Sequence, residues 1–236
     1  MEKNMTTLQF RPAQRKQAKL RLALASPSGN GKTFSALRIA KGLGGKVVIL
    51  DTEAGSADLY AEHFAYDVLQ MNAPFTPEKY IMAIKAAEEA KYNVLIVDSL
   101  SHSWAGQGGL LDKHGALADK GGNSFAAWRT VTPEYQKLVD TILQSSLHII
   151  TTLRSKTDYT VEAGQVIKLG LAPVIRDNFE YEMTIVFDLD KEHRGHTSKD
   201  RTGLFTNQVV EMNEKVGEQL LEWLEGGNPS VLVNPE

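Results

Sequence analysis

A glycine-rich loop between an apolar run and a helix-like run is the feature that most constrains this chain. Residues 26–33 read SPSGNGKT, an apolar run over 20–25 precedes them, and a helix-like run begins at Lys32. This order fits the phosphate-binding pattern G-x-x-x-x-G-K-[ST], with serine at the first glycine position. We therefore expect the loop to bind phosphate, and the alternative is an ordinary glycine-rich turn before a helix.

The residue types in this loop suit a bound nucleotide. Gly29 and Gly31 let successive N–H groups turn toward an anion, and the N-terminus of the following helix adds partial positive charge. Lys32 would reach the β- and γ-phosphates, and the Thr33 hydroxyl would ligate Mg²⁺. We predict that ATP and Mg²⁺ bind here, with the nucleotide contacted by Ser26, Pro27, Ser28, Gly29, Asn30, Gly31, Lys32, Thr33, Phe34 and Thr152.

Composition places the chain among ordinary globular proteins. Its 236 residues suit one large α/β domain, and its net charge of −3 gives no overall basic bias for nucleic acid. The chain has no cysteine, and no apolar run approaches the ~20 residues of a membrane span. We therefore expect a cytoplasmic protein without membrane contact, in which any nucleic-acid contact uses a local patch.

Apolar strand-like runs alternate with amphipathic helix-like runs along most of the chain. This alternation predicts βαβ units and a mainly parallel, twisted sheet flanked by helices. We expect a basic arm over 1–19, one domain over 20–226 and a tail over 227–236. The predicted strands cover 20–25, 47–51, 67–71, 94–98, 147–152 and 183–189, and helices are predicted over 32–43 and 57–64, from Thr76 and Thr132 onward, and near the C-terminus.

Two acidic positions follow predicted strands, at the edge of the sheet where ligands bind. Asp98 ends the apolar run VLIVD, where a carboxylate can hold Mg²⁺ directly or through water. Glu53 follows the run VVILD and is our candidate for the base that polarises the attacking water, with Asp51 next in line. The alternative role of Glu53 is that of a solvated loop acid or a helix N-cap partner.

These motifs, in this order, resemble the RecA-type recombinases. DTEAGSADLYAEHF resembles the region of that family where an acid-x-Glu ends a strand, and IVDSLSHSW resembles its magnesium-binding strand. The resemblance covers about residues 18–210 and implies a RecA-like P-loop NTPase core. It also implies a γ-phosphate sensor at the end of the next strand, for which Thr152 and Arg154 are the candidates.

The segment SKDRTG contains Lys199-x-Arg201 and resembles the basic finger of DnaB-type hexameric helicases. In those proteins the basic pair enters the ATP site of the adjacent subunit and stabilises charge on the transferring phosphate. The resemblance therefore implies that Lys199 and Arg201 act in catalysis between subunits. An exposed basic hairpin tip is the alternative interpretation.

The short chain looks most like the small RecA-like ATPases of bacteriophage recombination modules, which anneal single strands. That resemblance implies single-stranded DNA and a second copy of this chain, in a ring or filament, as partners. A single-strand-binding protein is a further candidate partner. The tetrapeptide Phe10-Arg11-Pro12-Ala13 has the Phe-x-x-Ala spacing by which subunits of this superfamily link.

We expect DNA contact in two polar segments, 101–125 and 154–170, that follow predicted strands. The first combines histidine, tryptophan and lysine with glycine, although Phe125 and Trp128 fit helix packing better than base stacking. Acidic residues offset the basic ones in both segments, so the electrostatic signal is modest.

Three other functions compete with a DNA-stimulated ATPase for strand annealing. The first is a helicase-like or translocase-like DNA motor of the same fold. The second is a P-loop kinase for a small molecule, which needs a lid with several arginines. The third is a nucleotide-gated interaction protein with little turnover.

Overall fold

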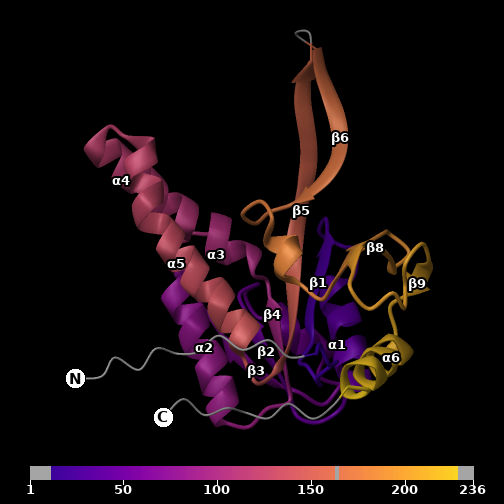
Figure 1. Ribbon diagram of the computed structural model, residues 1–236. Helices are drawn as coiled ribbons and strands as arrows, with labels where there is room; N and C mark the ends of the chain where they lie inside the picture. Colours follow the sequence, from indigo (N-terminus) through magenta and orange to yellow (C-terminus); the bar gives the residue numbers. More distant parts are fainter. Residues whose placement is uncertain (1–11, 163–164, 228–236) are drawn as a thin grey trace.

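The fold is seen in a computed structural model that describes residues 12–162 and 165–227 (Figure 1). Its centre is one sheet in the order β3-β2-β4-β5-β1-β7-β8-β9, with β6 paired to β5 outside this path. The strands from β3 to β7 in that order are parallel, and β8 and β9 add antiparallel pairs. The expected α/β class with a mainly parallel sheet is confirmed.

The strand bounds are close to those that the apolar runs predict. They are β1 Arg21–Ser26, β2 Val47–Asp51, β3 Asp67–Gln70, β4 Val94–Asp98, β5 His148–Glu162, β6 Gln165–Pro173, β7 Ile185–Leu189, β8 Arg194–Asp200 and β9 Val209–Glu211. Every residue of β1, β2 and β4 is buried, as expected for parallel strands covered on both faces.

Helices cover both faces of the sheet. Successive strand residues point to opposite faces, so Leu22 and Leu24 of β1 lie in one core while Ala23 and Ala25 lie in the other. The first core contains α1 (Lys32–Leu43) and α6 (Glu214–Glu225), and the second contains α2 (Pro77–Glu89) and α5 (Ser124–Gln144). The remaining helices are α3 Ser101–Ala105, α4 Leu110–Gly121 and the 3₁₀ turns η1 Ser56–Tyr60 and η2 Phe179–Glu182.

The prediction of a loop over 101–125 is wrong, because this segment is mostly helical. It contains α3, α4 and the start of α5, and α4 packs along α5 as a helical hairpin (Figure 1). Asn123 caps α5 by accepting a hydrogen bond from Ala126 N, so that helix starts well before Thr132 and Pro133 lies inside it. The many glycines and polar residues of this segment obscure the helical periodicity of its apolar residues.

The two aromatic residues expected to pack in this hairpin differ in their environment. The Trp128 ring stacks on Trp104 with centroids 5.8 Å apart and on His114 at 4.0 Å, which confirms its packing role. Phe125 is 86% exposed at the start of α5, so its expected packing role is wrong. The helical hairpin therefore presents the solvent-exposed ring of Phe125 at the start of α5.

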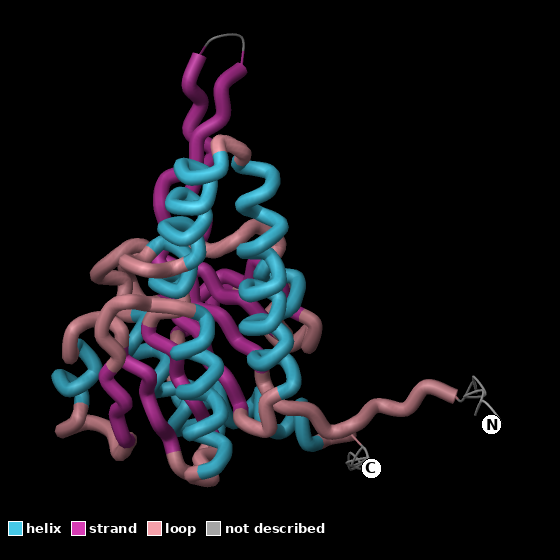
Figure 2. The backbone as a smooth tube through the Cα atoms, turned by 90° about the vertical axis from the view of Figure 1, so that its left-hand side faces the viewer, coloured by secondary structure: helices cyan, strands magenta, loops and turns pink. Residues whose placement is uncertain are grey.

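The second expected loop, over 154–170, is also corrected. Strand β5 continues past the sheet and pairs with β6 from Ser155↔Pro173 outward, with one bulge at Asp158/Tyr159. Figures 1 and 2 show this hairpin projecting well beyond the body, on the side toward which α4 also extends. The two strands pair through backbone hydrogen bonds alone, so their polar sequence gives no sign of a hairpin.

No helix in the described ranges is long and apolar enough to cross a membrane. The cytoplasmic location stays a prediction.

The contact between α1 and α6 predicts one effect on stability. A Cβ atom at Gly217 would lie 2.2 Å from the Ile39 carbonyl oxygen, so Gly217→Ala forces the two helices apart. We expect the free energy of unfolding to fall by about 1–3 kcal/mol in urea titrations. Gly115→Ala on α4 is the matched control, because its Cβ meets nothing within 4 Å and alanine favours helix. Equal stability of the two variants would contradict this close approach.

Candidate functional site

The phosphate-binding loop joins β1 to α1 at the carboxyl edge of the sheet. Gly29 and Gly31 have φ of 89° and 75°, which the sequence pattern requires of glycine. A Cβ at Gly31 would also lie 2.4 Å from His193 Nδ1. Both the positive φ and this clash therefore exclude larger residues at position 31. Ser26 is the last residue of β1 and sits in the ladder opposite Arg154, where extended backbone accepts serine in place of glycine.

The Lys32 side chain folds back onto the backbone of the phosphate-binding loop. Its Nζ donates to the carbonyl oxygens of Ser26 and Pro27, each at 3.0 Å. Burial lowers the pKa of Lys32, an effect that the carboxylates of Asp98 and Glu53 oppose. The ammonium group therefore lies inside the loop, where phosphate oxygens could replace the two carbonyl oxygens as hydrogen-bond acceptors.

Asp98 is the buried acid of the site, with 2% of its surface exposed. Its Oδ2 accepts a hydrogen bond from Thr33 Oγ1, and its Oδ1 accepts one from Thr152 Oγ1, each at 2.5 Å. Burial raises the pKa of Asp98, and the two hydroxyl donors partly offset this. Thr152 thus contacts the acid from β5 and is not among the residues that line the cavity, so its expected nucleotide contact stays a prediction.

The oxygens of Thr33 and Asp98 fit a magnesium ion. A threonine hydroxyl at a helix start and a carboxylate at a strand end are hard ligands of the kind Mg²⁺ takes beside nucleotide phosphates. Within the described ranges no three His, Asp or Glu side chains cluster as a metal site. Any Mg²⁺ here would therefore take its remaining ligands from water and the nucleotide.

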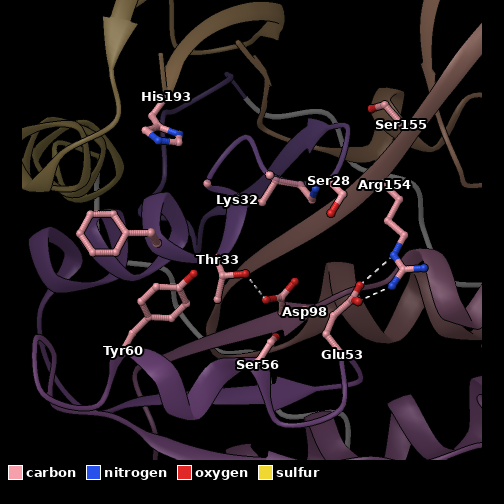
Figure 3. A pocket seen from close by; sticks show the side chains of 13 residues that line it. Ser28, Lys32, Thr33, Glu53, Ser56, Tyr60, Asp98, Arg154, Ser155 and His193 are labelled. Carbon is pink, nitrogen blue, oxygen red and sulfur yellow. Dashed lines mark hydrogen bonds and ion pairs between the residues drawn. The ribbon is translucent and has the colours of Figure 1, made fainter. Parts of the chain in front are cut away.

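Glu53 lies in the same cavity but is held in an ion pair. Arg154 Nε donates to Glu53 Oε1 at 2.9 Å, and Arg154 Nη2 donates to Oε2 (Figure 3). Burial alone would raise the pKa of Glu53, but these bonds and the charge of Arg154 lower it. The carboxylate is thus ionised and oriented, with both oxygens engaged.

Asp51, the second candidate base, is occupied by backbone. Its Oδ1 accepts from Glu53 N at 2.6 Å and its Oδ2 accepts from Ala57 N at 3.3 Å. The side chain is fully buried and fixes the turn that leads into η1. Glu53 is therefore the better placed carboxylate to polarise a water that attacks a phosphate in the cavity.

The cavity over the loop has a volume of about 820 Å³ and is lined by Ser28, Gly29, Gly31, Lys32, Thr33, Phe34, Glu53, Ser56, Tyr60, Asp98, Arg154, Ser155 and His193 (Figure 3). The sequence did not point to Ser56, Tyr60, Ser155 or His193. Tyr60 and Phe34 form an aromatic wall with ring centroids 5.7 Å apart, and such a wall suits a nucleotide base. His193 comes from the turn after β7, where only the fold brings it over the loop.

Lys199 and Arg201 lie outside this cavity. Lys199 Nζ donates to the Glu180 carbonyl at 2.9 Å and also to Tyr181 O, and Arg201 Nη2 donates to Tyr181 O at 2.6 Å. Both therefore rest on η2 of their own chain. Their proposed action on a neighbouring subunit stays a prediction.

The sheet, the glycine loop and the paired Thr33 and Asp98 define a P-loop NTPase. A family model described as an AAA domain matches residues 18–224, and the chain belongs to that family. It is an AAA-type P-loop ATPase domain, a class that binds and hydrolyses nucleotide, usually with Mg²⁺. No curated protein matches the sequence.

The position of Lys32 predicts loss of activity without loss of fold. Lys32→Ala removes the cation from the loop, so we expect ATP hydrolysis to become undetectable while the melting temperature stays within a few degrees. Lys41→Ala on the same helix, whose side chain is 62% exposed, is the matched control and should keep full activity. Normal hydrolysis by folded Lys32→Ala would remove the phosphate-binding assignment.

Glu53 predicts separation of binding from turnover. Glu53→Gln keeps the shape and the hydrogen-bond acceptor but lacks a basic carboxylate, so turnover should fall by ~10²-fold or more. Nucleotide affinity, measured by titration with a fluorescent ATP analogue, should change little. A normal turnover rate for Glu53→Gln would place the base elsewhere.

Proposed function

We propose that this protein is a RecA-like, Mg-ATP-hydrolysing ATPase that works as an oligomer on single-stranded DNA, in phage-type strand annealing or recombination. The ATPase class rests on the family and the site. The DNA substrate and the assembly are the parts that go further, and each has its own supporting observation.

The observation that carries the DNA proposal is the continuity of β5. Arg154 lines the nucleotide cavity and holds Glu53, and the very next residue, Ser155, begins the projecting β5–β6 ladder. A shift of Arg154 toward a bound phosphate would therefore act directly on the base of the hairpin. Such a link suits a protein whose hold on DNA depends on its nucleotide.

The projecting elements also offer the chemistry that single-stranded nucleic acid needs. Phe125 exposes its ring at the start of α5, and Lys156 is exposed on β5, one residue after Ser155 of the cavity lining. Bases stack on exposed aromatic rings, and lysine compensates phosphate charge. The helical hairpin and the β-hairpin extend toward the same end of the molecule, so one strand could contact both (Figures 1 and 2).

The oligomer proposal is supported by the basic pair on β8 and its loop. Arg201 is exposed and Lys199 half-buried, and neither reaches the chain's own cavity. Contacts to backbone carbonyls of η2 can be exchanged for a neighbour's nucleotide without breaking an ion pair. Phe10 and Arg11 of the Phe-x-x-Ala segment lie outside the described residues.

A DNA motor is the second candidate function, and the Lys199-x-Arg201 pair is what favours it. A motor would couple ATP turnover to movement or duplex opening, whereas an annealing protein would join complementary strands. Strand-displacement and annealing assays on the same preparation separate these two functions.

The ATPase rate with and without single-stranded DNA tests the proposal. We expect strong stimulation by oligonucleotides and none by heparin, a polyanion without bases. Phe125→Ala should weaken single-stranded DNA binding by about 1–3 kcal/mol in fluorescence anisotropy. Met82→Ala is the matched control, since Met82 is 68% exposed on α2. Phosphate transfer to a metabolite in place of DNA stimulation would favour a kinase.

Action between subunits predicts rescue on mixing. Arg201→Ala should bind ATP without turnover, and mixing it with Glu53→Gln should restore part of the activity. The reason is that a mixed oligomer pairs an intact Glu53 site with an intact Arg201 of its neighbour. Absence of recovery at every mixing ratio, despite demonstrated co-assembly, would exclude the finger role.

A further inference from the structure

A histidine behind the site faces the candidate base. His102 lies on α3, in the turn of chain that follows Asp98 and β4. Its Nε2 is 4.0 Å from Glu53 Oε1, its Nδ1 is 2.7 Å from Thr52 Oγ1, and its ring stacks on Phe75 with centroids 4.8 Å apart. The imidazole is thus fixed on one face and at one nitrogen, with its other nitrogen directed at the carboxylate.

Two acceptors lie within reach of the Thr52 hydroxyl proton, and one of them is this ring. Thr52 Oγ1 accepts from Ser99 N at 2.9 Å, so its own proton is free to be donated. That proton goes either to the Ser99 carbonyl at 3.2 Å or to His102 Nδ1 at 2.7 Å, and the Glu53 carboxylate 4.0 Å from Nε2 favours the second arrangement. A neutral imidazole that accepts at Nδ1 carries its proton on Nε2. Burial and the charge of Arg154 lower the pKa of His102, which favours this neutral form.

Arg154 is the competitor for Glu53. It donates to both carboxylate oxygens, yet its side chain is 48% exposed in a cavity suited to phosphate. A γ-phosphate would attract the guanidinium, because phosphate oxygens accept bidentate donation as carboxylates do. Once Arg154 turns away, His102 Nε2 still faces Glu53 Oε1 from 4.0 Å.

We propose that His102 is a positioning residue for Glu53, holding Oε1 through Nε2–H so that Oε2 faces the attacking water. This inference rests on the proposed ATPase function and deepens it. In the reaction, the water oxygen bonds to the γ-phosphorus and gives its proton to Glu53 Oε2. The bond between the γ-phosphorus and the bridging oxygen breaks, and ADP leaves with the electron pair. His102 keeps its proton throughout.

Two amides separate this role from mere packing. In His102→Gln the amide N–H reaches about as far as Nε2 and can still donate to Glu53. In His102→Asn the shorter side chain can still accept from Thr52 but does not reach the carboxylate. We expect Gln to retain kcat within about threefold, while Asn and Ala lose roughly tenfold or more, since a hydrogen bond to a charged group is lost.

The Michaelis constant and nucleotide affinity should stay unchanged in all three variants, because His102 does not line the cavity. Adding His102→Ala to Glu53→Gln should cause no further loss, since the two groups act as a unit. His63→Asn is the control for a histidine substitution, as His63 is exposed beyond η1. Normal kcat in His102→Asn, or Asn outperforming Gln, would overturn the positioning role.

A spectroscopic test needs no variant. Nitrogen chemical shifts of ¹⁵N-histidine in the folded wild-type protein should show His102 protonated at Nε2 and not at Nδ1. A proton at Nδ1 would overturn the proposal even if the substitutions unfold the protein. An inactive wild-type protein would count against the ATPase function, whereas active enzyme with Glu53-dependent turnover and indifferent His102 variants would count only against the positioning role.

Discussion

The contact of two threonine hydroxyls with the Asp98 carboxylate holds the site together. Thr33 comes from the start of α1 and Thr152 from β5, and the acid that accepts from both ends β4. A carboxylate this deeply buried is costly unless each oxygen is satisfied, so the three elements are fixed relative to one another. The glycine loop, the candidate base and the aromatic wall all take their positions from that arrangement.

A second constraint is the position of β5 between β1 and β4 in the sheet. One strand thereby carries a hydroxyl for Asp98, an arginine for Glu53 and the root of the projecting hairpin. The cavity and the projecting hairpin therefore share one strand. The ion pair of Arg154 with Glu53 places beside the candidate base an arginine that can also bind phosphate oxygens.

The reach of sequence reasoning differs between the two halves of the site. Lys32, Thr33, Asp98 and Glu53 could be found because each sits at a strand end in a recognisable local pattern. His102, Tyr60 and His193 could not, since their importance depends on which side chains the fold places opposite them. The sequence does not predict the helices over 101–125, because glycine and polar residues obscure the helical periodicity. Packing of α4 against α5 stabilises the helix despite the low propensity of these residues.

The sequence by itself determined the class of the fold and the phosphate loop. Buried apolar runs and glycines with forced positive φ are local properties, which a linear pattern encodes directly. Only the tertiary structure decided that Glu53 pairs with Arg154, that Thr152 serves Asp98 and that Lys199 and Arg201 rest on η2. These are contacts between residues far apart in the chain, fixed by strand order and register, and a single sequence carries no local signal of either.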